Sequence, residues 1–292
     1  MGSGGKLSAM KIVIVSGLSG SGKSVVMRIL EDAGYCCVDN LPAAFLTQLI
    51  EQWQAVGESH LAVSCDTRSA TSLQAVPQAI EALRQAGHDV KVLFLTANDT
   101  ALIQRYSESR RRHPLAQLSS QPALTLHECI QQERDLLSSV ATLANVIDTS
   151  ALPVQTLRTW VNDFVSADRA ALTLLFESFA FKHGIPLDAD LVFDVRCLPN
   201  PFYDPNLRPL TGLDAPVADY LCAQAPVGEM IADITQFVEK WLPRYVHDNR
   251  SYLTIAIGCT GGQHRSVYCV QQIARHFAPT QQVIVRHRAL GK

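Results

Sequence analysis

Residues 17–24 carry the pattern G-x-x-x-x-G-K-[ST], and the segments around this pattern have the expected character. The apolar run Lys11–Ser16 before it is typical of a buried strand, and Ser24–Leu30 after it begins a helix. The glycines let successive backbone N–H groups curl around a phosphate, and the helix dipole favours its negative charge. A chance Gly/Ser-rich turn is the alternative, but it would not require both flanking elements. The pattern therefore predicts a nucleoside-triphosphate site in a parallel α/β sheet.

The last two positions of this loop have an expected role. Lys23 is expected to reach the β- and γ-phosphates, and the Ser24 hydroxyl to ligate Mg²⁺. Phosphoryl transfer also needs an acid near the metal ion, for which Asp39 and Asp66 are candidates and Asp66 is preferred. Helix capping or turn chemistry is the alternative for either aspartate. The predicted ATP site comprises Gly17, Leu18, Ser19, Gly20, Ser21, Gly22, Lys23 and Ser24.

The composition is that of an ordinary globular protein without a strong overall charge. The 292 residues are 47% hydrophobic and carry a formal net charge of −2, so a nucleic-acid site would have to be a local patch. The eight cysteines include no C-x-x-C pair, which favours a reducing compartment over a disulfide framework. We find no stretch long enough to span a membrane and no signal peptide. These features predict a cytoplasmic protein, which we expect to form a homo-oligomer.

Strands alternate with helices in the first half of the chain. This alternation predicts βαβ units, that is, a P-loop kinase-like parallel sheet with helices on both faces. The expected strands are Lys11–Ser16, Cys36–Asp39, His60–Asp66, Val90–Leu95 and Asn145–Asp148. The expected helices are 43–55, 73–86, 100–112, 124–143 and 153–168.

The second half begins a new α/β pattern. Strands are expected at 171–179, 191–195, 251–258 and 282–286, and helices at 226–247 and 266–277. We therefore predict a flexible or artificially added leader at 1–9, a P-loop NTP-binding domain at 10–168, and a smaller C-terminal α/β domain at 169–292. The C-terminal domain is the expected location of phosphorylated-ligand and RNA binding.

A second loop between a strand and a helix, Cys259–Ser266, reads CTGGQHRS. The spacing C-x-x-x-x-x-R after a strand is how cysteine-dependent phosphatases cradle a phosphate. It predicts a phosphate or phosphosugar site, with catalysis by Cys259 and a purely structural turn as alternatives. Asp194, at the end of a neighbouring strand, could accept hydrogen bonds from sugar hydroxyls. The predicted phosphorylated-ligand residues are Asp194, Cys259, Thr260, Gly261, Gly262, His264 and Arg265.

Positive charge is concentrated in two places. The first is the cluster Arg105, Arg110, Arg111, Arg112 and His113, which is either a lid over the phosphates or a solvated helix end. The second follows Asp248, after which the chain has no Asp or Glu. This segment predicts an electropositive surface for RNA or a phosphorylated ligand, or simply a basic tail. The RNA-binding candidates are Arg286, His287, Arg288 and Lys292.

Several strings together resemble one family, the RapZ (YvcJ-type) bacterial P-loop proteins. They are Gly17–Ser24, Cys37–Pro42, Arg105–Ser107, Arg111–Leu115, Phe181–Pro186, Phe193–Arg196, Leu198–Pro201, Gly258–Gly262 and His264–Val267. The resemblance implies ATP and GTP binding with weak hydrolysis, and a GTP-associated segment at Asp66, Thr67, Arg68 and Ser69. In enteric relatives it also implies an RNase adapter, which binds a small regulatory RNA, presents it to the endonuclease RNase E and senses glucosamine-6-phosphate.

The leading hypothesis is thus a regulatory protein that binds ATP or GTP with Mg²⁺ and responds to a phosphorylated amino sugar. Enteric relatives place a histidine in the ligand pocket where this chain has Phe202. A small-molecule P-loop kinase is the alternative function, because the P-loop, strand-end acids and arginine-rich segment follow the kinase order. A Cys259-dependent phosphatase is a third and weaker hypothesis.

Overall fold

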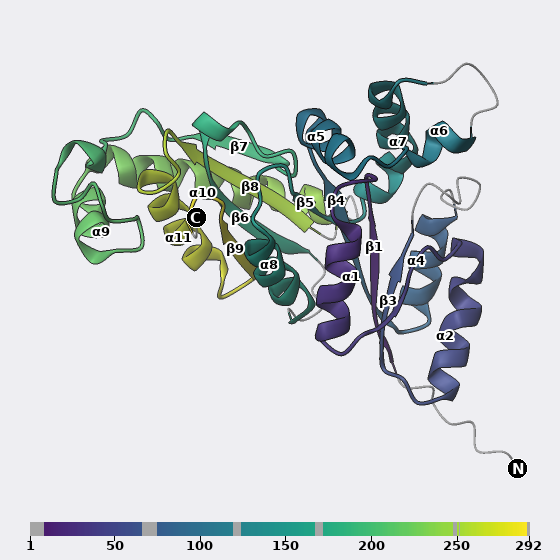
Figure 1. Cartoon of the computed structure of the whole chain (residues 1–292). Coiled ribbons are helices and arrows are strands. Elements are labelled where there is room, and N and C mark those ends of the chain that lie inside the picture. Colours follow the sequence, from purple (N-terminus) through teal and green to yellow (C-terminus); the bar gives the residue numbers. More distant parts are fainter. Residues whose placement is uncertain are drawn as a thin grey trace, which may run out of the picture. The chain divides into compact units, whose positions relative to one another are not determined.

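A computed structural model of the chain describes residues 9–65, 75–118, 124–166, 172–247, 250 and 252–290 (Figure 1). It divides into two compact units, Met1–Ala167 and Asp168–Lys292, each with its own apolar core. The expected leader lies, apart from Ala9, outside the described residues. No helix of the described segments is long and apolar enough to cross a membrane.

The first unit is built on a five-stranded parallel sheet with the order β2-β3-β1-β4-β5. The central strands are apolar and buried on both faces, as expected where helices cover a parallel sheet. All residues of β1 after Lys11 are buried. The strands are β1 (Lys11–Gly17), β2 (Cys36–Val38), β3 (His60–Ser64), β4 (Asp89–Thr96) and β5 (Asn145–Asp148).

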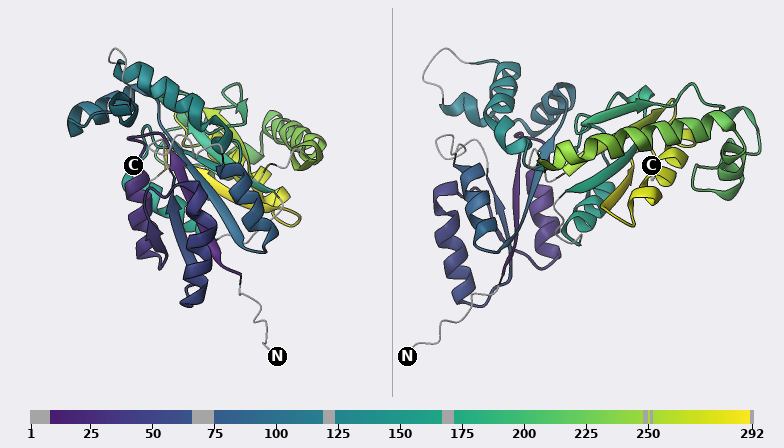
Figure 2. Two further views of the ribbon diagram at one scale, coloured as in Figure 1. Left: turned by 90° about the vertical axis from the view of Figure 1, so that its right-hand side faces the viewer. Right: turned by 180° about the vertical axis from the view of Figure 1, so that it is seen from behind.

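Helices cover both faces of this sheet, with α1 and α8 on one side and α2 and α4 on the other (Figures 1 and 2). Asn98 caps α5, because its side chain accepts a hydrogen bond from Ala101 N–H at 2.8 Å. Thr125 and Glu128 form a capping box that begins α7. The helices are α1 (Lys23–Asp32), α2 (Leu46–Ala55, preceded by the 3₁₀ turn η1, Ala43–Phe45), α4 (Val76–Gln85), α5 (Asp99–Ser109), α6 (Pro114–Leu118), α7 (Leu126–Ala141) and α8 (Val154–Ser166).

The order of the strands determines where a ligand can bind. The chain passes from β1 to β2 and β3 on one side, and then to β4 on the other side of β1. The loop that follows β1 therefore leaves the sheet at the point where the winding reverses. In open parallel sheets, ligands bind at this point beyond the carboxyl ends of the strands. The loop in question is Gly17–Ser24.

The second unit has a four-stranded parallel sheet with the order β7-β8-β6-β9. Helix α11 packs against β6, β8 and β9, and α9 and α10 pack against α11. The elements are β6 (Thr173–Ala180), η3 (Phe181–His183), β7 (Leu191–Asp194), η4 (Pro201–Tyr203), α9 (Ala215–Cys222), α10 (Ala225–His247), β8 (Tyr252–Cys259), α11 (Arg265–Phe277) and β9 (Gln282–His287).

The predicted α/β class is confirmed, and every predicted strand is present to within a few residues. The helix predicted at 100–112 is present as α5, but it is shorter than predicted at its C-terminal end. Helix α5 ends at Ser109 because Arg110 takes a left-handed conformation at φ 53°, and a short helix α6 begins at Pro114. Helix α9 was not predicted.

Candidate functional site

The loop Gly17–Ser24 turns its carbonyl groups towards donors of the protein itself. Lys23 Nζ donates to the carbonyl of Gly17 at 2.6 Å and to that of Leu18 at 3.2 Å. Ser21 adds a hydrogen bond from its hydroxyl to Leu18 O at 2.6 Å. These bonds close the loop into a compact turn and hold the Lys23 ammonium over it.

Donors from outside the loop bind its remaining carbonyls. Arg105 on α5 donates from Nη1 to Gly20 O at 3.1 Å and from Nη2 to Thr149 O at 2.6 Å. The Thr149 hydroxyl in turn donates to Ser21 O at 2.8 Å. A loop whose carbonyls are bound in this way can present its N–H groups to an anion.

The start of α1 completes the cradle. Its N-cap is Gly22 at φ 106°, a conformation that favours glycine and supplies no capping side chain. The first N–H groups of a helix have no partner within it, and the dipole places partial positive charge there. A phosphate group would satisfy both features at the junction of Gly22 and Lys23.

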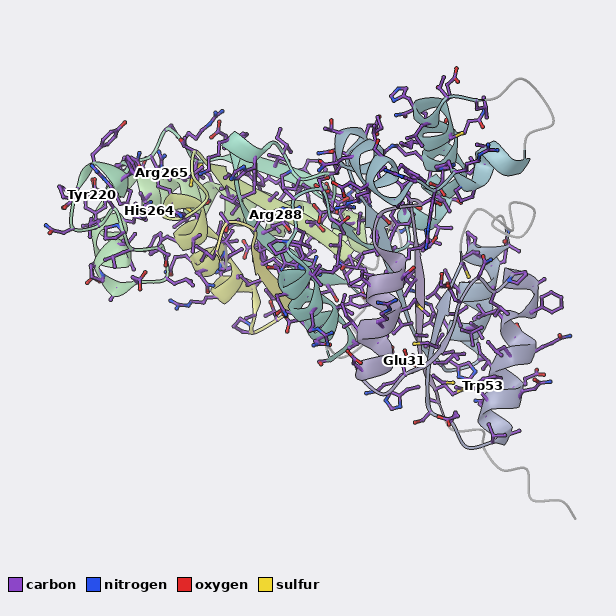
Figure 3. All side chains as sticks on the ribbon, in the orientation of Figure 1. Glu31, Trp53, Tyr220, His264, Arg265 and Arg288 are labelled. Carbon is purple, nitrogen blue, oxygen red and sulfur yellow. The ribbon has the colours of Figure 1, made fainter. Side chains whose placement is uncertain are left out.

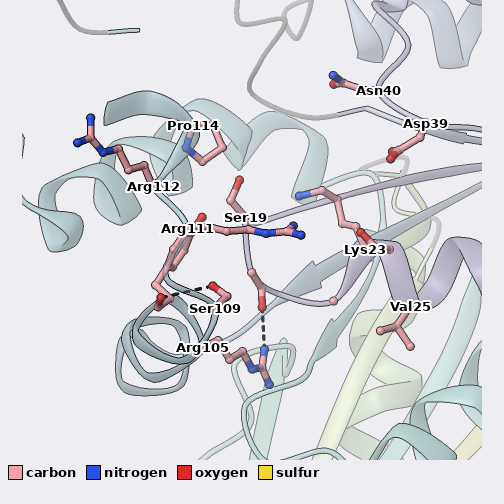
Figure 4. Close-up of a pocket in the computed structure, with 14 residues that line it drawn as sticks. Ser19, Lys23, Val25, Asp39, Asn40, Arg105, Ser109, Arg111, Arg112 and Pro114 are labelled. Atoms are coloured by element: carbon pink, nitrogen blue, oxygen red, sulfur yellow. Dashed lines mark hydrogen bonds between the residues drawn. The ribbon is translucent and has the colours of Figure 1, made fainter. Parts of the chain in front are cut away.

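A cavity of about 330 Å³ opens over this loop. Figure 4 shows Arg111 extended towards Lys23, whereas Arg112 turns the other way. Asp39 and Asn40, which follow β2, line the same cavity. The cavity is lined by Ser19, Gly20, Gly22, Lys23, Ser24, Val25, Asp39, Asn40, Arg105, Tyr106, Ser109, Arg111, Arg112 and Pro114.

A buried carboxylate lies behind the loop. Glu133 on α7 accepts hydrogen bonds from Ser19 N–H at 2.8 Å and from the Ser19 hydroxyl at 2.7 Å, and it lies 3.2 Å from His113 Nε2. Burial raises the pKa of Glu133, but the hydrogen bonds from His113 and Ser19 outweigh it and lower the pKa. The carboxylate is therefore held ionised inside the protein.

The second unit carries the other predicted loop, between β8 and α11. The Sγ atom of Cys259 accepts a hydrogen bond from Gly262 N–H at 3.2 Å and lies 3.2 Å from the Ser266 hydroxyl. Gly262 has φ 69°, and a Cβ atom there would come within 2.8 Å of the Ala289 side chain. Glycine at this position thus lets the loop fold back over the thiol.

Arg265 and His264 lie where this loop joins α11 (Figure 3). Arg265 donates from Nη1 to the carbonyls of Arg196 and Leu198, at 2.7 and 3.0 Å. Its Nε atom and the Nε2 atom of His264 are both buried and have no hydrogen-bond partner in the described part of the chain. Buried polar atoms normally have partners, so these two atoms leave hydrogen-bonding capacity at the loop that an anion or a water molecule could satisfy.

Asp194 ends the strand next to this loop, opposite Gly258 in the register of β7 and β8. Arg196 donates to both carboxylate oxygens of Asp194, at 2.7–3.0 Å. These bonds lower the pKa of Asp194. The carboxylate remains ionised and partly exposed, and can accept hydrogen bonds from hydroxyl groups.

Comparison with known proteins assigns both halves of the chain to one family. Residues 10–169 match the RapZ-like N-terminal domain, and residues 172–291 match the RapZ C-terminal domain. The chain belongs to the RapZ family. The family resemblance expected from the sequence motifs is thereby confirmed.

Relatives within the family are similar over nearly the whole chain. A nucleotide-binding protein of Herminiimonas arsenicoxydans is 56% identical over 286 residues, which cover 96% of this chain and 100% of the relative. A nucleotide-binding protein of Chromobacterium violaceum is 53% identical, with 96% and 99% covered. Both relatives are named as nucleotide-binding proteins.

Solved kinase structures are similar in fold to part of the chain. An unliganded sugar kinase from Janibacter sp. HTCC2649 covers 54% of this chain and 95% of its own, with a TM-score of 0.37 and 19% identity. A shikimate kinase from Bacteroides thetaiotaomicron covers 54% and 99%, with a TM-score of 0.36 and 13% identity.

The predicted ATP-site residues lie in one loop, whereas the members of the predicted basic cluster lie in different surroundings. Arg105 binds the P-loop backbone and Arg111 faces the cavity, whereas His113 is buried against Glu133. The cluster is therefore not a uniform lid or a solvated helix end. The metal candidate Ser24 and the alternative acid Asp39 line the cavity.

Some predicted site residues lie outside the part of the chain that the structure describes, and one buried acid near the site was not predicted. The preferred metal-site acid Asp66 and the GTP-associated segment Asp66–Ser69 lie outside the described residues, as does Lys292. Glu133 was missed from the sequence, because an acid in an amphipathic helix looks like a solvated residue. Its partner Ser19 lies 114 positions away along the chain.

Three of the predicted RNA-binding residues, Arg286, His287 and Arg288, do not form an open basic surface, which corrects that part of the sequence-based expectation. Arg286 is only 1% exposed. His287 is hydrogen-bonded to Ser178 and lies 3.0 Å from the Gln271 amide. Burial lowers the pKa of His287 to about 4, so this ring is neutral at physiological pH.

Arg288 is paired with acids from earlier in the chain. Its Nη1 atom lies 3.2 Å from Glu177 and 3.3 Å from Asp188, and both carboxyl groups are buried. Strand pairing of β6 with β9 brings these distant residues together. The Arg288 guanidinium is therefore paired with carboxyl groups inside the unit.

This buried cluster predicts a pH-dependent stability. Burial, reinforced by Asp188, raises the pKa of Glu177 from 4.5 to about 8. Between these values the unfolded chain loses its proton while the folded chain retains it, so stability falls as the pH rises from about 4.5 to about 8. We expect the protection factors of the β6 amides, which are corrected for the base-catalysed intrinsic exchange rate, to fall over this range, and Glu177→Gln to flatten the dependence.

Glu229→Gln, which removes an exposed acid of α10, is the matched control and should leave the wild-type profile unchanged. A Glu177→Gln variant with the full wild-type slope would contradict the assignment to Glu177.

Proposed function

We propose that this RapZ-family protein binds ATP or GTP with Mg²⁺ at Gly17–Ser24 and hydrolyses it slowly. The observation that carries the proposal is a closed P-loop whose carbonyls are bound by Lys23, Arg105 and Thr149, beneath a cavity that Arg111 also faces. Ser24 and Asp39 are available there to hold Mg²⁺, directly or through water. Mg²⁺ would supply charge neutralisation at the β- and γ-phosphates. The segment Asp66–Ser69 is proposed to associate with GTP on family grounds.

We further propose that the Cys259–Arg265 loop binds a phosphorylated amino sugar such as glucosamine-6-phosphate. The unpartnered Nε of Arg265 and Nε2 of His264 support an anion at the loop. Asp194 beside it would accept hydrogen bonds from the sugar hydroxyls. Phe202, 49% exposed, stands at the position where enteric relatives have a histidine, so the sugar contacts are expected to differ there.

The RNA and its endonuclease are proposed partners of a homo-oligomeric RNase adapter, on family grounds. One surface of the second unit supports RNA contact. Tyr203 is 80% exposed beside Phe202, and the Arg208 guanidinium lies 4.8 Å from the centre of the Phe202 ring. Exposed aromatic rings with an arginine are typical stacking surfaces for unpaired bases.

If binding of the sugar phosphate and binding of RNA to this protein are coupled, glucosamine-6-phosphate should weaken RNA binding. A coupling free energy of 1–3 kcal/mol corresponds to about a 5- to 150-fold change in affinity, and the effect must be reciprocal. Fluorescence anisotropy of a labelled small RNA, titrated with and without the sugar phosphate, measures it. Equal RNA affinity in both titrations would contradict the sensing role.

A small-molecule kinase is the second candidate, because Asp39 lies in the same cavity as Arg111 and could face an acceptor hydroxyl. Multiple-turnover phosphorylation of a sugar or nucleoside would favour it over slow hydrolysis. A Cys259-dependent phosphatase is supported by the N–H and hydroxyl groups around Sγ. It requires that Cys259→Ser abolish phosphate release from an aryl phosphate while Lys23→Ala does not.

A further inference from the structure

One buried carboxylate connects two walls of the nucleotide cavity. Glu133 binds Ser19 in the P-loop through both oxygens, with Oε2 accepting from the backbone N–H and Oε1 from the hydroxyl. The same Oε2 atom lies 3.2 Å from His113 Nε2. The side chains of Glu133 and His113 are 0% and 1% exposed, so water does not weaken this connection.

The tautomer of His113 can be assigned from its other nitrogen. The backbone N–H of Leu115 donates to Nδ1 at 3.3 Å, so Nδ1 carries a lone pair. The proton of the neutral ring must then be on Nε2, which donates it to Glu133. His113 is thus fixed at both ends, between the carboxylate and the start of α6.

His113 ends the arginine turn, which we define as Arg110–His113. Arg111 lies two residues before it and faces the cavity, and it makes no ion pair with any residue that the structure describes. Tyr106 reinforces the link, because its ring lies 5.4 Å from the His113 ring and borders Gly20 of the P-loop. The position of Arg111 therefore depends on the residues that hold the P-loop.

We propose that Glu133 is a positioning residue that joins the P-loop to the arginine turn, so that the loop amides and Arg111 act on bound phosphates as one unit. This role rests on the proposed nucleotide site and adds a coupling between the P-loop and the arginine turn, which form two walls of its cavity. Without the His113 link, Arg111 would sample many rotamers and its contact with phosphate would be lost to conformational entropy. Glu133 itself would not touch the nucleotide.

A double-mutant cycle tests this coupling by calorimetric titration with Mg·ATP. His113→Phe keeps an aromatic ring but loses the bond to Glu133, and Arg111→Ala removes the cation. We expect Arg111→Ala alone to weaken binding by about tenfold, as for a charged hydrogen bond. In the His113→Phe background the same change should cost no more than about twofold, because the contact is already lost.

Two further variants keep the test decisive. His113→Gln can donate an amide N–H to Glu133 and should restore binding to within about twofold of wild type. If His113→Phe does not fold, Glu133→Leu removes the carboxylate from its bonds to both Ser19 and His113 and takes its place in the cycle. Asp135→Asn, an exposed acid on the same helix, is the control and should bind Mg·ATP like wild type.

The outcomes are distinguishable. An equal loss on Arg111→Ala in both backgrounds would overturn the coupling, since a merely structural role predicts additive effects. Unchanged affinity in folded His113→Phe would overturn it as well. Failure of the wild-type protein to bind Mg·ATP would instead overturn the proposed function on which the coupling rests.

Discussion

Lys23→Ala is expected to lower the affinity for Mg·ATP by about tenfold or more, because it removes a charge-assisted contact with the β- and γ-phosphates. The effect should extend to GTP, since both nucleotides share the triphosphate. The same substitution removes the bonds from Nζ to Gly17 and Leu18, so a thermal unfolding curve must accompany the titration. Calorimetric titration of wild type and Lys23→Ala with ATP and with GTP gives the dissociation constants to be compared.

The control for Lys23→Ala is Lys11→Ala. Lys11 begins β1 and its side chain is exposed at the opposite end of that strand. The Lys11→Ala substitution removes an equal charge from the same unit. It should leave the nucleotide affinity within about twofold of wild type, because a distant surface charge is screened. A folded Lys23→Ala variant with wild-type affinity would show that the loop is not the nucleotide site.

Gly17→Ala is expected to destabilise the first unit by about 2–5 kcal/mol, from backbone strain together with overpacking. Gly17 has φ 139°, and an added Cβ would lie 2.6 Å from Leu95 N and closer still to Leu95 O. These atoms belong to β4, which pairs with β1 in register at this position, so they cannot move without breaking the sheet. Urea unfolding measures the loss.

The Gly34→Ala substitution shows how much of the Gly17→Ala effect comes from backbone strain and how much from the steric clash with Leu95. Gly34 also has a positive φ of 87°, but an added Cβ would meet no atom within 4 Å. Only the conformational cost remains, which is about 1 kcal/mol. Equal destabilisation by the two substitutions would mean that the Leu95 contact does not constrain the loop.

Local patterns carried most of the fold prediction. The runs that became β1 and β4 consist mainly of buried apolar residues, and a glycine ends β1 and another precedes β4, so both strands can be identified from neighbouring residues alone. The loops at Gly17 and Cys259 were identifiable for the same reason. Each lies within one strand–loop–helix unit of the sequence.

Long-range contacts account for what could not be predicted. Arg288 looks like part of a free basic tail because no acid is near it in the sequence, yet its partner Glu177 lies 111 positions away. The ionised state of Glu133 likewise depends on Ser19 and His113, which only the packing of α7 against the P-loop brings together. The break after Ser109 depends on a left-handed arginine, which no helix propensity indicates.

The chain is proposed to hold two separate anion sites, one in each unit. Calorimetric titration of the full-length protein with Mg·ATP and with glucosamine-6-phosphate, in wild type, Lys23→Ala and Arg265→Gln, tests it most directly. We predict that wild type binds both ligands, that Lys23→Ala loses only ATP, and that Arg265→Gln loses only the sugar phosphate. Wild-type protein that binds neither ligand, or a Lys23→Ala variant that keeps full ATP affinity, would contradict the account.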